Sequence, residues 1–246
     1  MSELAGKRAL VTGASRGIGA AIALALAEKG ADVAITYERS ADKANEVVRA
    51  IQAKGRRGFA IQADSADAAA VQASVQDAVG QLGGLDILVN NAGIARGGPV
   101  ADMGLADIDA MLAVNVRSVV LASQAAIPHL GKGGRIISIG STLALRVPFG
   151  GVTVYSMTKA ALISFTGGLA RELGPQGITV NLVHPGSTDT DMNPANGEQS
   201  EVQRSMTALG HYGKPADIAA AVAFLASPAA SQITGTGLLV DGGANA

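Results

Sequence analysis

The chain has 246 residues, of which 48% are hydrophobic and 16% are charged, and its 19 basic and 20 acidic side chains leave a net charge of −1 at pH 7. This balance excludes a disordered chain, and it provides no overall field for nucleic acid or an anionic membrane. The absence of Cys excludes disulfides, thiolate catalysis and cysteine-ligated metals. The longest apolar stretches, at 20–27 and 218–226, are shorter than the ~18 residues of a membrane span. Because no secretory stretch precedes the first strand-like segment, we expect a cytoplasmic protein.

Short apolar runs alternate with longer, helix-periodic segments along the whole chain. The predicted strands are residues 8–12, 32–36, 58–62, 86–90, 135–138, 179–183 and 237–240. The predicted helices are residues 17–29, 41–54, 66–82, 106–130, 154–173 and 215–225. Because the strands are almost continuously apolar, both faces of the sheet should be covered. We expect an α/β fold: a single domain over residues 1–246 with a Rossmann-like, doubly wound parallel sheet of about seven strands and helices on both faces.

One segment, residues 187–213, breaks this rhythm before the last helix and strand. Its Asp, Asn, Pro and Gly residues indicate a loop with a short helix. A long irregular excursion in a compact α/β domain is often a lid or binding loop, although surface decoration would have the same composition. We expect a substrate-binding lid at this position.

A glycine-rich loop follows the first strand and opens the first helix. Gly13, Gly17 and Gly19 let the chain turn sharply, bring backbone N–H groups near a pyrophosphate, and pack the helix onto the sheet. The positive N-terminus of a helix also favours a phosphate. The spacing is G-x3-G-x-G rather than the general G-x-G-x-x-G. Its placement between strand and helix indicates dinucleotide binding.

Several motifs in chain order resemble those of the short-chain dehydrogenase/reductase family. Residues 12–19 match its T-G-x3-G-x-G motif, residues 90–93 match N-N-A-G, and Tyr155 with Lys159 match Y-x3-K. Asn115 lies in the helix that follows the fourth strand, Ser141 follows the fifth strand, and the Pro-Gly pair at 185–186 follows the sixth. The resemblance covers essentially the whole chain and is closest to the 3-oxoacyl-(acyl-carrier-protein)-reductase-like branch, including residues 233–237 and 240–243. It implies an NAD(P)-dependent oxidoreductase acting on carbonyl and alcohol groups.

The end of the second strand bears on the choice of cofactor. An acidic residue there would bind the ribose of NAD and repel the 2′-phosphate of NADP. The family's acidic position falls on uncharged Tyr37, whereas Arg16 and Arg39 could provide positive charge and Ser40 a hydroxyl. A shift of one residue would instead place the Glu38 carboxylate near the ribose. We expect NADP(H), with NAD(H) as the less favoured alternative.

The resemblance implies further cofactor contacts along the chain. Asp64 should border the adenine, although its position before an alanine-rich helix also fits a helix N-cap. The other residues that the resemblance places at the cofactor are Ser15 and Ile18 in the glycine loop, Ser65 beside the adenine, Asn91, Ala92 and Gly93 at the adenosine, and Pro185, Gly186, Thr188 and Thr190 toward the nicotinamide.

The residues predicted to act on the substrate are Asn115, Ser141, Tyr155 and Lys159. Tyr155 and Lys159 are four residues apart in a predicted helix and share one face. A free phenol has a pKa of ~10, and a nearby ammonium lowers it. We expect Tyr155 to exchange the proton, Lys159 to assist it and to bind the nicotinamide ribose, and Ser141 to donate to the substrate oxygen. By resemblance, Asn115 supports a water that links Lys159 to solvent.

The choice of Ser141 depends on the alignment of the loop around it. If the segment before Tyr155 had one residue more than the common family spacing, Thr142 would occupy the position of the family's serine. Ser138 also flanks the loop. The run of residues 136–141 fixes the alignment better, and it favours Ser141.

The substrate pocket and the assembly are predicted less specifically. An apolar wall should consist of Thr142, Leu143, Leu145, Val147, Phe149, Val152, Met192 and Met206, so we expect a small carbonyl substrate with an apolar flank. Arg96 and Arg146 are alternative contacts for a carrier protein or an acidic substrate. The sequence of residues 189–197 differs from that of the lid in the commoner reductases of this branch, which argues against an acyl-carrier substrate. The resemblance implies a homotetramer in which helices 106–130 and 154–173 pair across subunits, with close approach at Ala160, Ala161, Gly167 and Gly168.

Two other classes of function compete with an enzyme. A regulatory protein could keep the fold and use the nucleotide pocket for sensing without turnover, and a structural protein could bind a carrier protein. The complete set of four predicted reacting residues favours the enzyme. No set of His, Asp and Glu has metal-ligand spacing, so we expect no catalytic metal.

Overall fold

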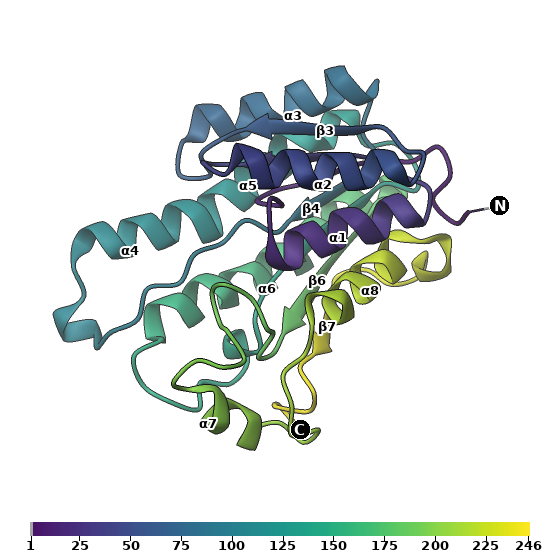
Figure 1. Cartoon of the computed structure of the whole chain (residues 1–246). Helices are drawn as coiled ribbons and strands as arrows, with labels where there is room; N and C mark the ends of the chain where they lie inside the picture. The colour runs from purple at the N-terminus through teal and green to yellow at the C-terminus, as the bar shows by residue number, and fades with distance from the viewer. Residues whose placement is uncertain (1) are drawn as a thin grey trace.

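The computed structural model describes residues 2–246 as a seven-stranded parallel sheet between two layers of helices (Figure 1). The strands are β1 (Arg8–Val11), β2 (Asp32–Tyr37), β3 (Gly58–Gln62), β4 (Ile87–Asn90), β5 (Arg135–Ile139), β6 (Thr179–Pro185) and β7 (Gly237–Val240). Their order in the sheet is β3-β2-β1-β4-β5-β6-β7. The helices are α1 (Gly17–Glu28), α2 (Ala41–Ala53), α3 (Ala68–Leu82), α4 (Leu105–Leu112), α5 (Ser118–Ala126), α6 (Thr153–Leu173), α7 (Ser200–Ser205) and α8 (Pro215–Ala226). The predicted α/β fold is confirmed.

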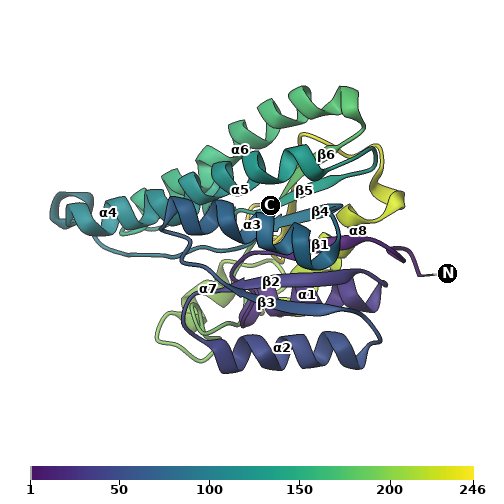
Figure 2. The ribbon, with the colours of Figure 1, turned by 90° about the horizontal axis from the view of Figure 1, so that it is seen from above.

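The alternation of side chains along each strand divides the core into two layers. In β1, Val11 packs toward α1, α2 and α8, whereas Leu10 packs toward α3, α5 and α6. Val89 and Leu88 of β4 divide in the same way. Figure 2 shows α1, α2 and α8 on one side of the sheet and α3, α5 and α6 on the other. The inner strands read as continuously apolar because both sheet faces are buried there, whereas the edge strand β7 is exposed or half-buried in the single chain.

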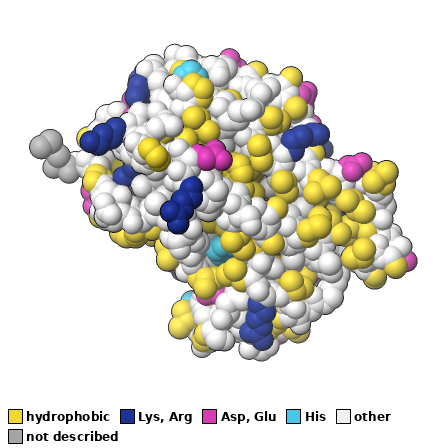
Figure 3. Space-filling model, turned by 180° about the vertical axis from the view of Figure 1, so that it is seen from behind, with side chains coloured by type: hydrophobic (Ala, Val, Ile, Leu, Met, Phe, Trp, Pro, Cys, Tyr) yellow, Lys and Arg dark blue, Asp and Glu magenta, His cyan; other side chains and the backbone are white. Residues whose placement is uncertain are grey.

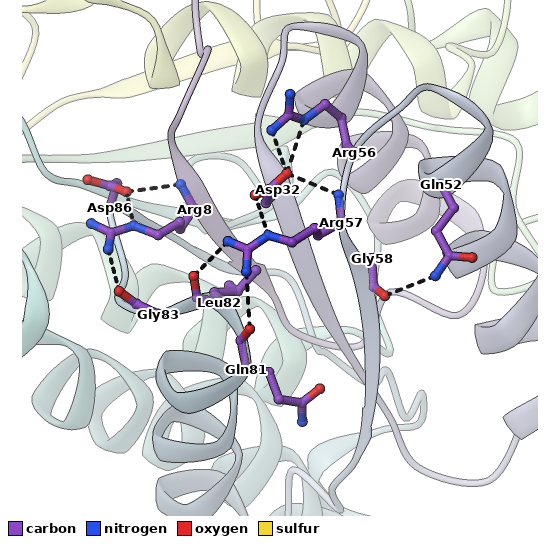
Figure 4. Close-up of polar contacts among 10 residues, drawn as sticks. All are labelled: Arg8, Asp32, Gln52, Arg56, Arg57, Gly58, Gln81, Leu82, Gly83 and Asp86. Atoms are coloured by element: carbon purple, nitrogen blue, oxygen red, sulfur yellow. Dashed lines mark hydrogen bonds and ion pairs between the residues drawn. The ribbon is translucent and has the colours of Figure 1, made fainter.

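The amino ends of the strands carry paired charges (Figure 4). The Asp32 carboxylate accepts hydrogen bonds from Arg56 Nη2 and Arg57 Nε, each at 2.7 Å. Asp86 accepts from Arg8 Nε at 2.7 Å. Burial raises the pKa of each carboxyl group, but the arginine hydrogen bonds outweigh it and hold both pKa values below the ordinary range. These ion pairs join β2 to the residues that precede β3, and β1 to the residue that precedes β4.

The predicted helix at 106–130 is confirmed as one helical run, Leu105–His129, but this run is not α-helical throughout. The segment consists of α4, a π-helical turn at Ala113–Arg117, α5 and a 3-10 turn at Ile127–His129. A π turn inserts one extra residue per turn, and such turns occur frequently at functional sites. Here the turn carries Asn115, which is fully buried.

The same segment has the composition of a membrane-spanning helix. Leu105–His129 is the one helical run within residues 2–246 that is long and apolar enough to cross a membrane, at 25 residues and a mean hydropathy of 1.5. This finding differs from the expectation that every apolar stretch of the chain is too short to span a membrane. In the folded chain the run packs against α3 and α6, and 44% of its apolar window is buried. Part of its apolar surface is therefore buried in the core of the folded chain.

Candidate active site

A cleft of about 1400 Å³ opens at the carboxyl ends of the strands. It extends from the end of β2 across the loops after β1 and β4 to α6 and the segment 187–213. The chain leaves β1 toward β2 on one side and enters β4 on the other, so the strand order reverses between β1 and β4. Such a switch point is where open parallel sheets bind their ligands. Figure 1 shows α7 and the C-terminus at the same end of the sheet.

The glycine loop is fastened to the neighbouring strands by hydrogen bonds. Gly13 N donates to Thr36 Oγ1 at 2.9 Å, and Asn91 Nδ2 donates to the carbonyl oxygens of Thr12 and Gly13 at 2.9 and 3.0 Å. Gly13 has a φ of +61°, and a Cβ there would lie 2.8 Å from Ala92 Cα. A larger residue is therefore excluded, and the loop backbone closes directly onto the loop that follows β4.

The N-terminus of α1 is open to an anion. No side chain of residues 2–246 caps this end, and the first turn carries no acidic residue. By contrast, the N-terminus of α3 is capped by Asp67, whose carboxylate accepts from Ala69 N and Ala70 N. The first N–H groups of a helix need an acceptor, and the helix dipole favours a negative one. The residues around this end therefore fit the pyrophosphate of a dinucleotide.

The structure gathers every residue predicted for the cofactor along this one cleft. They are Gly13, Ser15, Arg16, Gly17, Ile18, Gly19, Tyr37, Arg39, Ser40, Asp64, Ser65, Asn91, Ala92, Gly93, Tyr155, Lys159, Pro185, Gly186, Thr188 and Thr190. Asp64 does not cap a helix, since α3 begins later and uses Asp67. Glu38, the residue that would favour NAD, also lines the cleft.

The charges at the β2 end of the cleft are paired with one another. Arg39 Nε lies 2.9 Å from Glu38 Oε1, and Arg16 Nη1 lies 2.8 Å from Asp191 Oδ2 across the cleft. Lys43 Nζ lies 3.7 Å from the same Asp191 oxygen. The hydrogen bond from Arg16 and the charge of Lys43 lower the pKa of Asp191. Sequence reasoning missed Lys43, because an exposed lysine on a helix carries no local signal of its neighbours.

Tyr155 and Lys159 lie one turn apart on α6 and line the cleft together. Lys159 is buried, its Nζ donates to the carbonyl oxygen of Ile139 at 2.9 Å, and it lies 6.0 Å from the centre of the Tyr155 ring. Burial lowers the pKa of Lys159 to about 8. Burial also raises the pKa of Tyr155, and a side-chain hydrogen bond with Ser141 opposes this only in part. The expectation of a lowered tyrosine pKa is wrong for this structure, because desolvation outweighs the other contributions.

Ser141 occupies the position expected of the substrate-orienting hydroxyl. It is buried beside Tyr155, and its Oγ accepts from Leu143 N at 3.1 Å at the start of a 3-10 turn over Thr142–Ala144. Thr142 also lines the cleft. Ser138 does not, because its hydroxyl faces Asn90, whose Nδ2 lies 3.3 Å away. The geometry favours Ser141 over both neighbours.

Asn115 lies behind the cleft rather than in its lining. Its Nδ2 donates to the carbonyl oxygen of Ile94 at 2.9 Å and to Thr158 Oγ1 at 3.0 Å, while its Oδ1 accepts from Ile94 N at 2.9 Å. Asn115 therefore joins the loop after β4 to the residue next to Lys159. The role of Ile94, which acts only through its backbone, has no signal in the sequence.

The substrate end of the cleft has an apolar wall with two arginines. Thr142, Leu143, Phe149, Val152, Met192 and Met206 line it, whereas Leu145 and Val147 are exposed outside it, which corrects that part of the predicted wall. Arg96 and Arg146 line the same end. Arg96 pairs with Asp107 at 3.5 Å, and Arg146 Nη1 donates to the carbonyl oxygen of Ala244. Within residues 2–246 no cluster of His, Asp and Glu could hold a metal ion.

Known proteins are similar to this chain over nearly its whole length. A family model described as enoyl-(acyl carrier protein) reductase matches residues 13–245. A 3-oxoacyl-(acyl-carrier-protein) reductase from Staphylococcus aureus is 45% identical over 96% of this chain and 97% of its own. A cyclic-di-GMP-binding biofilm dispersal mediator protein from Escherichia coli is 41% identical over 98% of each.

A solved structure agrees still more closely. It is a short-chain dehydrogenase from Burkholderia cenocepacia in complex with NADP, with 64% identity, a TM-score of 0.98, and coverage of 99% of this chain and 100% of the other. The family match, the sheet order and the convergence of the motifs on one cleft agree. The chain belongs to the short-chain dehydrogenase/reductase family.

Proposed function

We propose that this protein is an NADP(H)-dependent oxidoreductase that interconverts a carbonyl and a secondary alcohol, with Tyr155 as the general acid and base. One observation carries the proposal: Tyr155, Lys159 and Ser141 open into the same cleft as the uncapped N-terminus of α1. The proton-transfer groups and the phosphate-binding end thus serve a single ligand-binding space. The nicotinamide, when bound, would supply the hydride, and the protein supplies position and electrostatics.

The protonation states of the side chains suit the reduction of a carbonyl. Because burial raises the pKa of Tyr155, the phenol is protonated at neutral pH and holds a proton for the substrate oxygen. The Ser141 hydroxyl, which lines the cleft together with Tyr155, is placed to orient that oxygen and to stabilise the negative charge that develops on it. Lys159 is protonated below its pKa of about 8 and assists the loss of the phenolic proton.

The charges at the β2 end support NADP(H). Tyr37 ends β2 without a carboxylate, and Arg16 faces the cleft from the glycine loop with 60% of its side chain exposed. Arg39 lies at the same end. The Burkholderia relative is solved with NADP. A 2′-phosphate would find these guanidinium groups within the cleft, and Arg binds phosphate with strong, charge-assisted hydrogen bonds.

A sensing protein without turnover is the second candidate. The observation that favours it is the 41% identity to a relative described as binding cyclic-di-GMP, a nucleotide ligand. The buried lysine beside Tyr155 argues against pure sensing, because a binding pocket does not need a proton-transfer pair. A panel of carbonyls and alcohols, assayed with NADPH and NADH, discriminates between the two candidates.

We also propose a homotetramer. Apolar side chains are exposed on two separate faces: Val120, Met157 and Ile163 on α5 and α6, and Phe224, Leu238 and Leu239 on α8 and β7. Figure 3 shows hydrophobic side chains gathered on the side of the molecule where α4 and α6 lie. A tetramer of D2 symmetry uses two distinct two-fold interfaces, so two apolar faces suit this assembly.

Replacing Tyr155 by Phe should lower kcat about 100-fold or more, because the proton donor is lost while the cleft is unchanged. Ser141→Ala should cost about 100-fold through lost stabilisation of the oxygen charge, and Thr142→Ala should stay within about 3-fold of the wild type. The measurement is consumption of NADPH with the best carbonyl of the panel. Full activity in Tyr155→Phe, or a loss at Thr142 with none at Ser141, would contradict the mechanism.

Lys159→Met should inactivate the enzyme and yet stabilise the apoprotein. The drop in the lysine pKa from 10.5 to about 8 corresponds to roughly 3 kcal/mol of burial cost at neutral pH. The bond to Ile139 is lost in exchange, at about 1 kcal/mol, so the net gain is about 2 kcal/mol in the free energy of unfolding. Denaturant unfolding of both proteins measures it.

The sign of the pH dependence follows from the lowered pKa. Below pH 8 the lysine is protonated in both the folded and the unfolded chain, and the burial cost is fully present. Between about pH 8 and 10.5 the folded chain releases its proton first, so the wild type regains stability and the advantage of Lys159→Met shrinks. Lys132→Met, at an exposed lysine, is the control and should show no such trend. If Lys159→Met were less stable than the wild type at pH 7, the conclusion that burial of the Lys159 ammonium destabilises the folded chain would be refuted.

Arg16→Gln should raise the KM for NADPH about 10-fold and that for NADH less than about 3-fold, because only NADPH carries the 2′-phosphate. Arg49→Gln is the matched control, since Arg49 is exposed on α2 outside the cleft. Steady-state kinetics with both cofactors provide the measurement. An NADH preference of the wild type, or equal losses with both cofactors, would exclude this role.

Light scattering should report a mass of four chains for the wild type. Gly168 on α6 is exposed, and a Cβ there meets nothing within 4 Å in the single chain. Gly168→Glu should therefore fold but separate the tetramer into dimers, because it places a charge in a close helix contact. Gly80→Glu is the control, since Gly80 of α3 has equally open space around it. A tetrameric Gly168→Glu, or a monomeric wild type, would oppose the assembly.

A further inference from the structure

His184 is a buried imidazole for which the proposed reaction has no use. It is the penultimate residue of β6, which lies between β5 and β7, and only 2% of its surface is exposed. In the sequence it precedes the Pro-Gly pair and carries no motif of its own. A buried polar ring needs a hydrogen-bond partner, so its contacts indicate what it does.

Two glycines on the neighbouring strands make room for the ring. A Cβ at Gly140, just after β5, would lie 2.8 Å from His184 Nδ1. A Cβ at Gly237, the first residue of β7, would lie 2.5 Å from Nε2. Any side chain at either position would displace the imidazole. The imidazole ring therefore occupies a closely packed position between Gly140 and Gly237.

The ring is directed at the backbone of Ser141. His184 Nδ1 lies 2.9 Å from the Ser141 carbonyl oxygen. A carbonyl oxygen can only accept, so Nδ1 carries the proton and donates it. Burial lowers the pKa of His184, and the nearby charge of Lys159 lowers it further, while the bond to Ser141 opposes this. The ring is thus neutral at physiological pH, with its single proton on the side that faces Ser141.

Ser141 is held at both its carbonyl and its hydroxyl. Its backbone is extended, with φ −165° and ψ 150°, and its Oγ accepts from Leu143 N at 3.1 Å. The same side chain opposes the rise in the pKa of the Tyr155 phenol, so the two groups lie near each other. With the carbonyl fixed from β6 and the Oγ fixed by the following turn, the hydroxyl is kept in the direction of Tyr155.

We propose that His184 is a positioning residue that acts through Ser141, by donating from Nδ1 to the Ser141 carbonyl and so directing the Ser141 hydroxyl at the substrate oxygen and Tyr155. The inference rests on the proposed function. It concerns a contact to the Ser141 backbone from a residue that does not line the cleft, and it adds a strand, β6, to the elements that set the reacting geometry.

A double-mutant cycle with Ser141 tests this role. His184→Leu should lower kcat about 10-fold with the KM for NADPH unchanged, because a displaced hydroxyl loses its alignment while the cofactor cleft stays intact. In a Ser141→Ala background the same substitution should cost less than about 2-fold, since the group on which it acts is gone. Equal losses in both backgrounds would overturn the inference.

Two further variants separate the hydrogen bond from packing. Asn places its amide nitrogen where His Nδ1 lies, whereas Gln places it nearer the position of Nε2. His184→Asn should retain at least about a third of the kcat, and His184→Gln should resemble His184→Leu. Asn181→Leu, also buried on β6 but hydrogen-bonded to Ile233, is the control, and its effect should be the same with or without Ser141. An Asn variant as poor as the Gln variant would contradict the role.

A readout without turnover keeps the two proposals distinguishable. The chain has three Tyr, so tyrosine labelled with a heavy carbon isotope at Cζ gives three signals, and the one missing in Tyr155→Phe belongs to Tyr155. His184→Leu and Ser141→Ala should shift this signal alike, and His184→Asn should not. If the wild type turns over no carbonyl, the proposed function fails, yet the shift still tests the contact. An unmoved Tyr155 signal in His184→Leu overturns the inference even in an active enzyme.

Discussion

The hydrogen bonds between Thr12 and the loop after β4 set the geometry on which the site depends. Thr12 Oγ1 accepts from Asn91 N at 3.0 Å and from Ala92 N at 3.1 Å, which ties the end of β1 to the end of β4 where the strand order reverses. The contacts continue along the chain. Ile94 is bonded to Asn115, and Asn115 to Thr158, the residue before Lys159. A shift of the glycine loop would therefore be transmitted to α6, so the phosphate-binding end and the proton-transfer pair keep a fixed separation.

Carboxylates at the amino ends of the strands are paired with basic side chains, whereas the buried lysine at the carboxyl ends has no acidic partner among the described residues. At the amino ends, the carboxylates of Asp32 and Asp86 each pair with two basic side chains, and their pKa values are lowered. At the carboxyl ends, Lys159 has only a backbone carbonyl as its hydrogen-bond partner among the described residues, and its pKa falls to about 8. A paired charge stabilises the chain, whereas an unpaired buried ammonium destabilises it. The ion pairs of the carboxylates Asp32 and Asp86 thus lie away from the cleft, whereas the unpaired buried charge of Lys159 lies where the chemistry takes place.

The sequence predicted the sheet, the cleft-lining residues and the reacting set, because these depend on periodicity and on motifs that follow strands. It did not predict the π-helical turn at Asn115, since such a turn preserves the apolar helix pattern on both sides of it. The start of α3 was displaced because Asp64 and Asp67 are both plausible caps, and only the backbone decides between them. The pKa of Tyr155 was expected to fall, because the spacing to Lys159 is visible in sequence whereas the degree of desolvation is not.

The chain contains 32 Gly residues, and some of them provide the room that polar side chains need around the site. A Cβ at Gly93 would lie 3.2 Å from Lys159 Nζ, and a Cβ at Gly19 would crowd the Asn91 amide. Gly140 and Gly237 do the same for His184. In each case the missing side chain lets a buried polar group reach its partner. Turns alone account for only part of the glycine content, because these four residues include none with a positive φ. At each of them the first atom that an added Cβ would meet belongs to a polar side chain of the site.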